Sequence, residues 1–434
     1  MSTDQLSNTV MSVLSSCPMS ERSQCTERVQ QDSLLTRISR NLLHKRLSSM
    51  STGQLLLTEA AQTYAFGDAG GGGSVDIQVH SPNFYKRTIA GGAMGAAESY
   101  LDGEWSSSDL TQLFQVLFRN SEVLQKVQSW TSGLSRLAGR FEHLANRNSK
   151  SGSRKNIQEH YDLGNEFFQL FLDPSMMYSS ALFTSPGMSL EDASWEKLDR
   201  ICRTLELSPA DHVVEIGTGW GGFALYAAQK YGCRVTTTTI SEEQFRFATE
   251  RIRQAGMSDR VTVLQQDYRD LTGQYDKLVS IEMIEAVGKK YLPTYFETCN
   301  RLLKPDGAML IQAITIPEQR YESYSRSVDF IQKYIFPGGF LPSVSAMQSC
   351  IAKSSNLTLV DCYDFGLHYA KTLRLWSERF HTELEAVKQL GFNDRFIRMW
   401  RYYLSYCEAA FLERATGVVQ AVWTRPGSSI GICR

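Results

Sequence analysis

From about residue 156 onward, short apolar runs alternate with segments whose apolar residues recur at helical spacing. Strands are predicted at residues 213–216, 234–240, 261–264, 277–281 and 308–314, with helices between them at 223–231, 242–255 and 292–303. Strand and helix alternating at this spacing predict a parallel, doubly wound sheet. Strands at 357–360 and 418–423 complete the predicted sheet, and the helical, aromatic segment 371–416 lies between them. The predicted fold class is therefore α/β.

The chain before residue 156 follows a different pattern. Residues 1–45 are rich in Ser, Thr and Gln, which predicts a disordered tail with a short helix near residues 34–43. Residues 46–130 are predicted to form a small α+β domain, because Val75–His80 alternates like a strand and helical spacing runs through 110–117. The α/β domain is expected to span residues 156–434.

A basic segment at 131–155 is predicted to link the two domains. It holds a single acid, Glu142, among six cations: Arg136, Arg140, Arg147, Lys150, Arg154 and Lys155. Such a segment is either a solvated connector or a contact for anionic lipid headgroups, and the sequence leaves both readings open.

Composition narrows the class of protein only a little. The formal net charge of −1 gives no overall attraction to nucleic acid or to a membrane, so a nucleic-acid partner is not expected. Nine cysteines without a CxxC pair argue against a disulfide framework or a zinc site and for a reducing compartment. No run of about eighteen apolar residues is present, and no secretory leader is expected.

The sharpest local feature is a glycine loop between a predicted strand and a predicted helix. It reads Val213-Val214-Glu215-Ile216-Gly217-Thr218-Gly219-Trp220-Gly221-Gly222. Glycines let the backbone turn tightly and approach a ligand closely. With an acid two residues before the first glycine, the loop resembles the E/D-x-G-x-G-x-G loop of S-adenosylmethionine methyltransferases, whose cofactor has a cationic amino-acid end. A structural turn or a nicotinamide site is the alternative interpretation.

Two further segments are expected to face the same ligand, because ligands bind outside the carboxyl ends of parallel strands. Thr239, Ile240, Ser241 and Gln244 follow the second predicted strand, and Asp267 and Tyr268 follow the third. Asp267 can hold an adenine amino group or simply cap a turn. Glu285 likewise can cap a helix, and Tyr369 can be a core aromatic residue.

Five motifs together resemble the cyclopropane-fatty-acyl-phospholipid synthases and the related mycolic acid cyclopropane synthases. The resemblance runs from about residue 75 to 425 and rests on segments 156–165, 177–181, the glycine loop, 282–288 and 334–343, extended by 366–376. It implies a Rossmann-like class I methyltransferase sheet, a small N-terminal lipid-interacting domain and a helical C-terminal lid. The implied cofactor-binding residues are Tyr178, Ser179, Glu215, Gly217, Thr218, Gly219, Trp220, Gly221, Gly222, Thr239, Ile240, Ser241, Gln244, Asp267 and Tyr268.

The resemblance also implies a chemistry and a base. A methylene passes from S-adenosylmethionine to the cis double bond of an unsaturated phospholipid, and a bound bicarbonate removes the proton that lets the ring close. Glu285 would accept a hydrogen bond from that bicarbonate, Tyr369 would donate one, and the backbones of Ser180 and Ile314 would touch it. On this expectation, Glu285→Gln strongly lowers turnover while the cofactor still binds.

Four further expectations accompany the resemblance. Many bacterial members carry His where this chain has Gln312, which can donate an amide N–H but cannot relay a proton. Cys407 matches a cysteine proposed as active in the family, although a buried Cys is usually a small hydrophobe. His160, Tyr161 and Tyr178 are expected to shape a lid over the cofactor. Aromatic residues that either wall an acyl tunnel or form ordinary core are Trp376, Phe380, Phe396, Trp400, Tyr402, Tyr403 and Phe411.

The competing functions are a fatty-acyl C-methyltransferase that forms methylene or methyl-branched chains, a non-catalytic lipid-binding protein, and a methyltransferase for soluble metabolites. The substrate class predicts a cytoplasmic protein in peripheral contact with the inner membrane leaflet, and a homodimer is an open expectation. No metal site is predicted.

Overall fold

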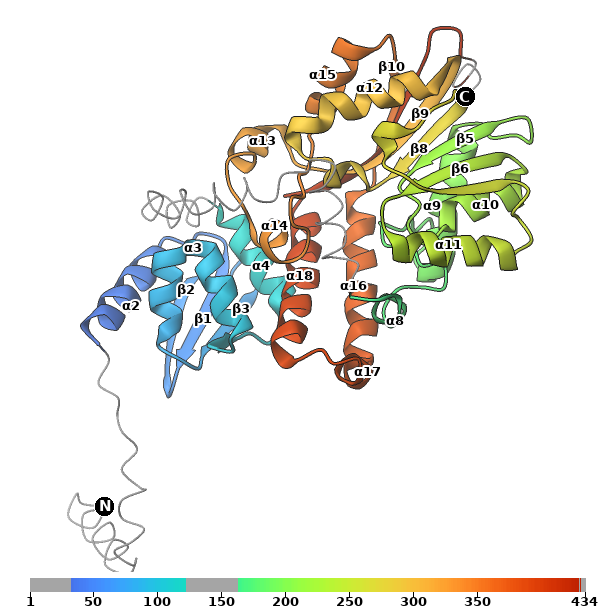
Figure 1. The fold of residues 1–434 in the computed structure, drawn as a ribbon. Coiled ribbons are helices and arrows are strands. Elements are labelled where there is room, and N and C mark those ends of the chain that lie inside the picture. The colour runs from blue at the N-terminus through green and yellow to red at the C-terminus, as the bar shows by residue number, and fades with distance from the viewer. Residues whose placement is uncertain (1–32, 122–162, 429, 431–434) are drawn as a thin grey trace, which may run out of the picture.

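The computed structural model describes residues 33–121, 163–428 and 430, and a seven-stranded sheet is its largest element (Figure 1). The strand order is β10-β11-β9-β8-β5-β6-β7. The strands are β5 (His212–Ile216), β6 (Arg234–Thr239), β7 (Val261–Gln265), β8 (Tyr275–Ile281), β9 (Leu303–Thr315), β10 (Thr358–Asp364) and β11 (Gly417–Thr424). β5 to β9 pair in parallel, whereas β11 runs antiparallel to both β9 and β10. The all-parallel prediction is wrong for β11, because a buried apolar strand has the same sequence pattern in either direction.

Helices cover both faces of this sheet and close two apolar cores. One face carries α9 (Leu190–Thr204), α10 (Gly222–Tyr231) and α11 (Glu242–Gln254), and the other carries α12 (Leu292–Leu302) and α15 (Val344–Ser354). Each predicted strand and helix of this region is present within a few residues of its expected bounds. The doubly wound α/β prediction is confirmed.

Short elements join the layers on the side of the sheet where β5 to β8 end. They are α8 (Asn165–Gln169), η1 (Tyr268–Asp270), η2 (Ile284–Ala286), η3 (Lys289–Tyr291), α13 (Glu318–Tyr324) and α14 (Phe330–Tyr334). The segment between β10 and β11 forms α16 (Gly366–Thr382), α17 (Leu384–Gln389) and α18 (Asp394–Leu412). The long helices α16 and α18 pack side by side between the sheet and the N-terminal domain (Figure 1).

The N-terminal domain is a four-stranded sheet with helices against it, ordered β2-β1-β3-β4. Its elements are α2 (Leu34–Leu47), β1 (Gly53–Glu59), β2 (Gln62–Asp68), β3 (Ser74–Val79), α3 (Asn83–Leu101), β4 (Trp105–Ser106) and α4 (Leu110–Arg119). The predicted tail boundary at residue 45 is wrong, because Leu43 and Leu47 of α2 are buried in the core of this domain. The predicted basic linker at 131–155 lies outside the described residues.

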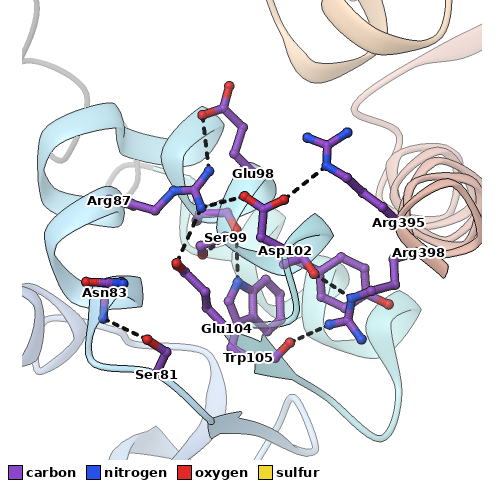
Figure 2. A network of polar contacts seen from close by, with 12 residues as sticks. Ser81, Asn83, Arg87, Glu98, Ser99, Asp102, Glu104, Trp105, Arg395 and Arg398 are labelled. Atoms are coloured by element: carbon purple, nitrogen blue, oxygen red, sulfur yellow. Dashed lines mark hydrogen bonds and ion pairs between the residues drawn. The ribbon is translucent and has the colours of Figure 1, made fainter. Parts of the chain in front are cut away.

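Arginines of α18 hold the N-terminal domain in place (Figure 2). Arg398 donates to the backbone carbonyl oxygens of Tyr100 at 2.5 Å and Trp105 at 2.7 Å, which lie at and just beyond the end of α3. Arg395 pairs with Asp102 at 3.0 Å, and Arg87 reaches the same carboxylate at 2.7 Å. Carbonyl oxygens and a carboxylate thereby hold two cations of α18 at several points, which fixes the orientation of the domain.

Among the described helices, none is both long and apolar enough to cross a membrane.

Candidate active site

A cavity opens where the carboxyl ends of β5, β6, β7 and β8 meet, which is the place where open α/β sheets bind ligands. From there it continues between the long helices and reaches Phe118 of α4 in the N-terminal domain. Twelve of the fifteen residues proposed for cofactor binding line it: Tyr178, Ser179, Glu215, Gly217, Thr218, Gly219, Trp220, Thr239, Ile240, Gln244, Asp267 and Tyr268.

The glycine loop has two different halves. Gly217 and Gly219 line the cavity with φ angles of +103° and +53°, and a Cβ on Gly217 would lie 3.0 Å from the side chain of Met283. Gly221 and Gly222 instead begin α10 against Ala248 and Met177. The first pair brings the backbone close to a ligand, whereas the second pair serves helix packing.

Ser241 has a structural role of the same kind as Gly221 and Gly222. It caps α11 by accepting a hydrogen bond from the Gln244 backbone N–H, and it does not line the cavity. The adjacent Thr239 donates to the side-chain oxygen of Gln244 at 2.8 Å, which holds that side chain at the cavity wall.

Two acids at the ends of strands line the cavity. Glu215 of β5 is buried, and burial raises its pKa to about 8, although the Thr237 hydroxyl donates to it at 2.6 Å. A cationic ligand group would stabilise the ionised form of this carboxyl. Asp267 lines the cavity, but it also caps η1 and pairs with Arg269 at 2.6 Å. The capping interpretation is confirmed, and the contact with an adenine amino group stays a prediction. The cavity, the close backbone at Gly217 and these acids fit S-adenosylmethionine.

The centre of the site is Glu282, which the sequence prediction left without a role. Its carboxylate accepts three hydrogen bonds: from the Ser180 backbone N–H at 2.9 Å, the Gln312 amide at 2.7 Å and the Tyr369 hydroxyl at 2.7 Å. The first two end on Oε1 and the third on Oε2. Residues from three distant segments thus converge on one carboxylate at the cavity wall.

The backbone of Glu282 is strained. Its φ of +49° lies in the left-handed region, which costs about 1–2 kcal/mol for a residue with a Cβ. The backbone N–H is held by the Gln312 carbonyl at 2.8 Å, one residue beyond the end of β8. Strain of this kind persists where surrounding contacts over-determine a conformation, and it concentrates at functional positions.

Glu285 lies next to Glu282 and has a different environment. Its Oε1 accepts the Ile314 backbone N–H at 2.5 Å, and its Oε2 is buried without a hydrogen-bond partner among the described residues. Burial raises the pKa of both carboxyls, and the neighbouring Glu282 charge helps to raise that of Glu285 to about 8. Three donors favour the charged form of Glu282, whereas Glu285 accepts one, so Glu282 is the better placed of the two to carry negative charge and Glu285 to hold a proton.

Bicarbonate does not fit this arrangement. The groups expected to hold it were Ser180, Gln312, Tyr369, Ile314 and Glu285. Three of their donors already serve the Glu282 carboxylate, and the Ile314 N–H serves Glu285. Gln312 donates an amide N–H to an anion as predicted, but the anion is a side chain of the protein itself.

Comparison with known proteins identifies the family. The family model described as mycolic acid cyclopropane synthetase matches residues 148–421. The chain is 40% identical to the cyclopropane-fatty-acyl-phospholipid synthase of Escherichia coli, over 82% of this chain and 89% of that one. The chain belongs to the mycolic acid cyclopropane synthetase family. It is equally 40% identical to the tuberculostearic acid methyltransferase UfaA1 of Mycobacterium tuberculosis, over 80% of this chain and 83% of that one.

Solved structures agree with this assignment. The mycolic acid cyclopropane synthase CmaA1 of that family, in complex with SAH and CTAB, matches with a TM-score of 0.59 and 31% identity over 63% of this chain and 98% of that one. A coclaurine N-methyltransferase at 19% identity and a TM-score of 0.58 shares the fold alone. The chain is thus an S-adenosylmethionine-dependent methyltransferase of the cyclopropane synthase family.

The aromatic residues of the lid helices divide between core and cavity. Tyr403 and Phe411 line the cavity of this synthase, and the Tyr403 hydroxyl meets that of Tyr178 at 2.9 Å. Trp376, Phe380, Phe396, Trp400 and Tyr402 do not line it and pack as core with Phe167 and its neighbours. The core interpretation is right for these five. His160 and Tyr161 lie outside the described residues.

Cys407 also lines the cavity, but its environment disfavours a thiolate. Burial raises the pKa of its thiol above the ordinary value, and the nearby Asp329 adds to that effect. A thiolate is the nucleophilic form of cysteine, so a covalent role is not expected. We predict that Cys407→Ala retains kcat within a few-fold of wild type. Steady-state kinetics will check this, and iodoacetamide labelling mapped by mass spectrometry should modify Cys407 in unfolded but not in native protein.

Proposed function

We propose that this enzyme converts the cis double bond of an unsaturated phospholipid acyl chain into a cyclopropane ring, with Glu282 as the base. S-adenosylmethionine supplies the methyl group, which the alkene π electrons take from the sulfonium, leaving a cationic carbon on the acyl chain. Glu282 then accepts a proton from the transferred methyl, and the released C–H electron pair forms the second carbon–carbon bond. The single observation that carries the proposal is the triply hydrogen-bonded carboxylate at the cavity wall.

The two oxygens of Glu282 differ in their readiness to take that proton. Oε1 accepts hydrogen bonds from Ser180 and Gln312, whereas Oε2 accepts one from Tyr369. A carboxylate oxygen has two lone pairs, so Oε2 is the oxygen with acceptor capacity left for the substrate proton. The proton passes to Oε2, and the Tyr369 hydroxyl keeps that oxygen aimed.

The acyl chain lies in the apolar part of the cavity. That part is walled by Ile314, Ile331, Phe336, Leu373, Tyr403 and Phe411. Apolar walls exclude water, which would otherwise quench the cationic carbon. Phe118 of the N-terminal domain lines the same cavity, and this supports a role for that domain at the lipid end of the site.

Peripheral contact with a membrane surface is part of the proposal. On α2 the side chains of Leu34 and Leu35 are 65% and 68% exposed, and Arg37 and Lys45 are exposed on the same helix. Exposed apolar side chains beside cations suit the interface of an anionic bilayer. Sedimentation with anionic vesicles should be weakened when Leu34 and Leu35 are both replaced by Ser.

A fatty-acyl C-methyltransferase that leaves a methylene or methyl branch is the second candidate. The 40% identity to a tuberculostearic acid methyltransferase favours it. Both reactions begin with the same methyl transfer, and the fate of the cation separates them.

Expression in a bacterial host that lacks cyclopropane lipids tests the proposal. Fatty acid methyl esters should gain one CH₂ on monounsaturated chains, and the product should contain no reducible alkene. A methylene product that hydrogenates to a methyl branch would replace the first candidate with the second. Unchanged lipids, in cells that contain folded enzyme able to bind S-adenosylmethionine, would contradict both.

A further inference from the structure

Four polar side chains form a hydrogen-bonded chain that runs from α9 across the neighbouring strands β11 and β9 to Glu282. Arg200 of α9 donates to the side-chain oxygen of Gln420 at 2.5 Å, and the Gln420 amide donates to the side-chain oxygen of Gln312 at 3.0 Å. The Gln312 amide then donates to Oε1 of Glu282 at 2.7 Å. Gln312 and Gln420 stand directly opposite each other on β9 and β11, and both are fully buried.

The two ends of this chain fix its direction. An arginine carries only donors, whereas an ionised carboxylate carries only acceptors, and a glutamine amide can face either way. With Arg200 at one end, each amide must turn its oxygen toward the arginine and its NH₂ toward Glu282. The last donor favours the ionised form of Glu282, because a charged carboxylate oxygen accepts a stronger hydrogen bond from the Gln312 amide than the oxygen of a neutral carboxyl does.

Arg200 is itself held firmly enough to act as the anchor. It pairs with Asp361 at 3.3 Å, and its guanidinium lies 4.1 Å from the centre of the Tyr363 ring. One turn earlier on α9, the fully buried ammonium of Lys197 donates to the Ser179 hydroxyl at 2.7 Å. Ser179 precedes Ser180, whose backbone N–H is the other donor to Oε1.

We propose that Arg200, acting through Gln420 and Gln312, is a positioning residue that keeps Glu282 ionised and leaves its Oε2 free to take the substrate proton. The inference rests on the proposed role of Glu282 as base. Arg200 touches neither substrate nor cofactor, and neither it nor Gln420 lines the cavity.

Gln420→Glu is the sharpest test of this relay. The introduced carboxylate, when ionised, still accepts from Arg200 but cannot donate to Gln312, so the Gln312 amide turns and presents its oxygen to Glu282. Glu282 loses one donor and faces a repulsive oxygen, which raises its pKa. The acid limb of kcat/KM should move to higher pH by about one to two units. Gln420→Met removes the donor without the repulsion and should give a smaller shift in the same direction.

Asp361→Asn is the matched control. It removes the charge of the Arg200 ion pair, but the asparagine oxygen can still accept from the guanidinium and the contact with the Tyr363 ring remains, so Arg200 stays anchored and its hydrogen bond to Gln420 is kept. The acid limb should then stay in place. Other groups that influence Glu282 electrostatically are Lys197, Glu285 and Tyr369, and all three are retained in every variant.

A readout that needs no turnover separates this inference from the proposed function. The C=O stretch of protonated Glu282 can be followed against pH in infrared difference spectra, with Glu282→Gln as the blank. Its midpoint should rise in the order wild type, Gln420→Met, Gln420→Glu. Equal midpoints in the three folded proteins would overturn the relay. A shifted midpoint in an enzyme that forms no lipid product would uphold the relay and reject the proposed function.

Discussion

Glu282→Gln is expected to lower kcat by about 10²–10⁴-fold, the range typical for removal of a general base. The amide keeps the size of the carboxylate. Its oxygen can still accept from Ser180 and Gln312, and its NH₂ can donate to the Tyr369 hydroxyl oxygen, so the site should stay assembled. An amide cannot take a proton from the transferred methyl. The affinity for S-adenosylmethionine, measured by calorimetry, should change little because the change lies on the acyl side of the cofactor loop.

Glu285→Gln is the matched comparison for this prediction. At neutral pH Glu285 is protonated, and a glutamine keeps a neutral group whose oxygen accepts the Ile314 N–H. Its loss of kcat should be much smaller than that of Glu282→Gln, in contrast to the expectation drawn from the family resemblance. Single-turnover assays on lipid vesicles will rank the two variants. The opposite rank would return the role of base to Glu285.

The pH dependence of kcat/KM should follow the protonation of Glu282. Burial raises the pKa of Glu282 above that of an ordinary carboxyl, so activity should rise with pH as Glu282 loses its proton. Protonation at low pH removes the acceptor, and kcat/KM falls. In Glu282→Gln this acid limb should disappear from the residual activity.

The sheet could be predicted from sequence because its signals are local. Buried strands such as Val213–Ile216 are short runs that are apolar apart from Glu215, and the helices between them carry apolar residues at a period near 3.6. The direction of β11 and the pairing of β1 with β3 depend on contacts far apart in the chain, so no local pattern reveals them. Burial of Leu43 and Leu47 could not be predicted either, because it depends on packing against distant segments and the residues around them are polar, as in a disordered tail.

The candidate site was predicted in its parts but not in its centre. Tyr369, Gln312 and the backbone of Ser180 were each identified as groups that hold an anion, and they do converge. Glu282 was present in the same motif, three residues before Glu285. One signal could have found it, namely its place directly after the end of a strand, where ligands bind in this class of fold. Its left-handed backbone has no trace in the sequence, because glutamate has no preference for that conformation.

The strained backbone of Glu282 makes glycine a suitable replacement at this position. Glycine adopts a φ of +49° without the cost that a Cβ imposes, so relief of this strain should offset part of the stability lost with the three hydrogen bonds, and Glu282→Gly should still fold. The donors of Ser180, Gln312 and Tyr369 would then surround a space the size of a carboxylate. Without added anions, this variant should be as slow as Glu282→Gln, because both lack the base.

Added formate or bicarbonate should restore turnover to Glu282→Gly by at least about tenfold, in a saturable manner. The free ion can accept the three hydrogen bonds and take the proton, but it must first be bound and ordered from solution, so recovery stays below wild type. Glu282→Gln is the control, since its amide still fills the space and should block rescue. Wild-type enzyme should keep its activity in buffer depleted of carbon dioxide, because its base is covalently part of the chain. Dependence of the wild type on bicarbonate, or equal rescue of both variants, would show that the ion acts elsewhere and that the Glu282 carboxylate is not the proton acceptor.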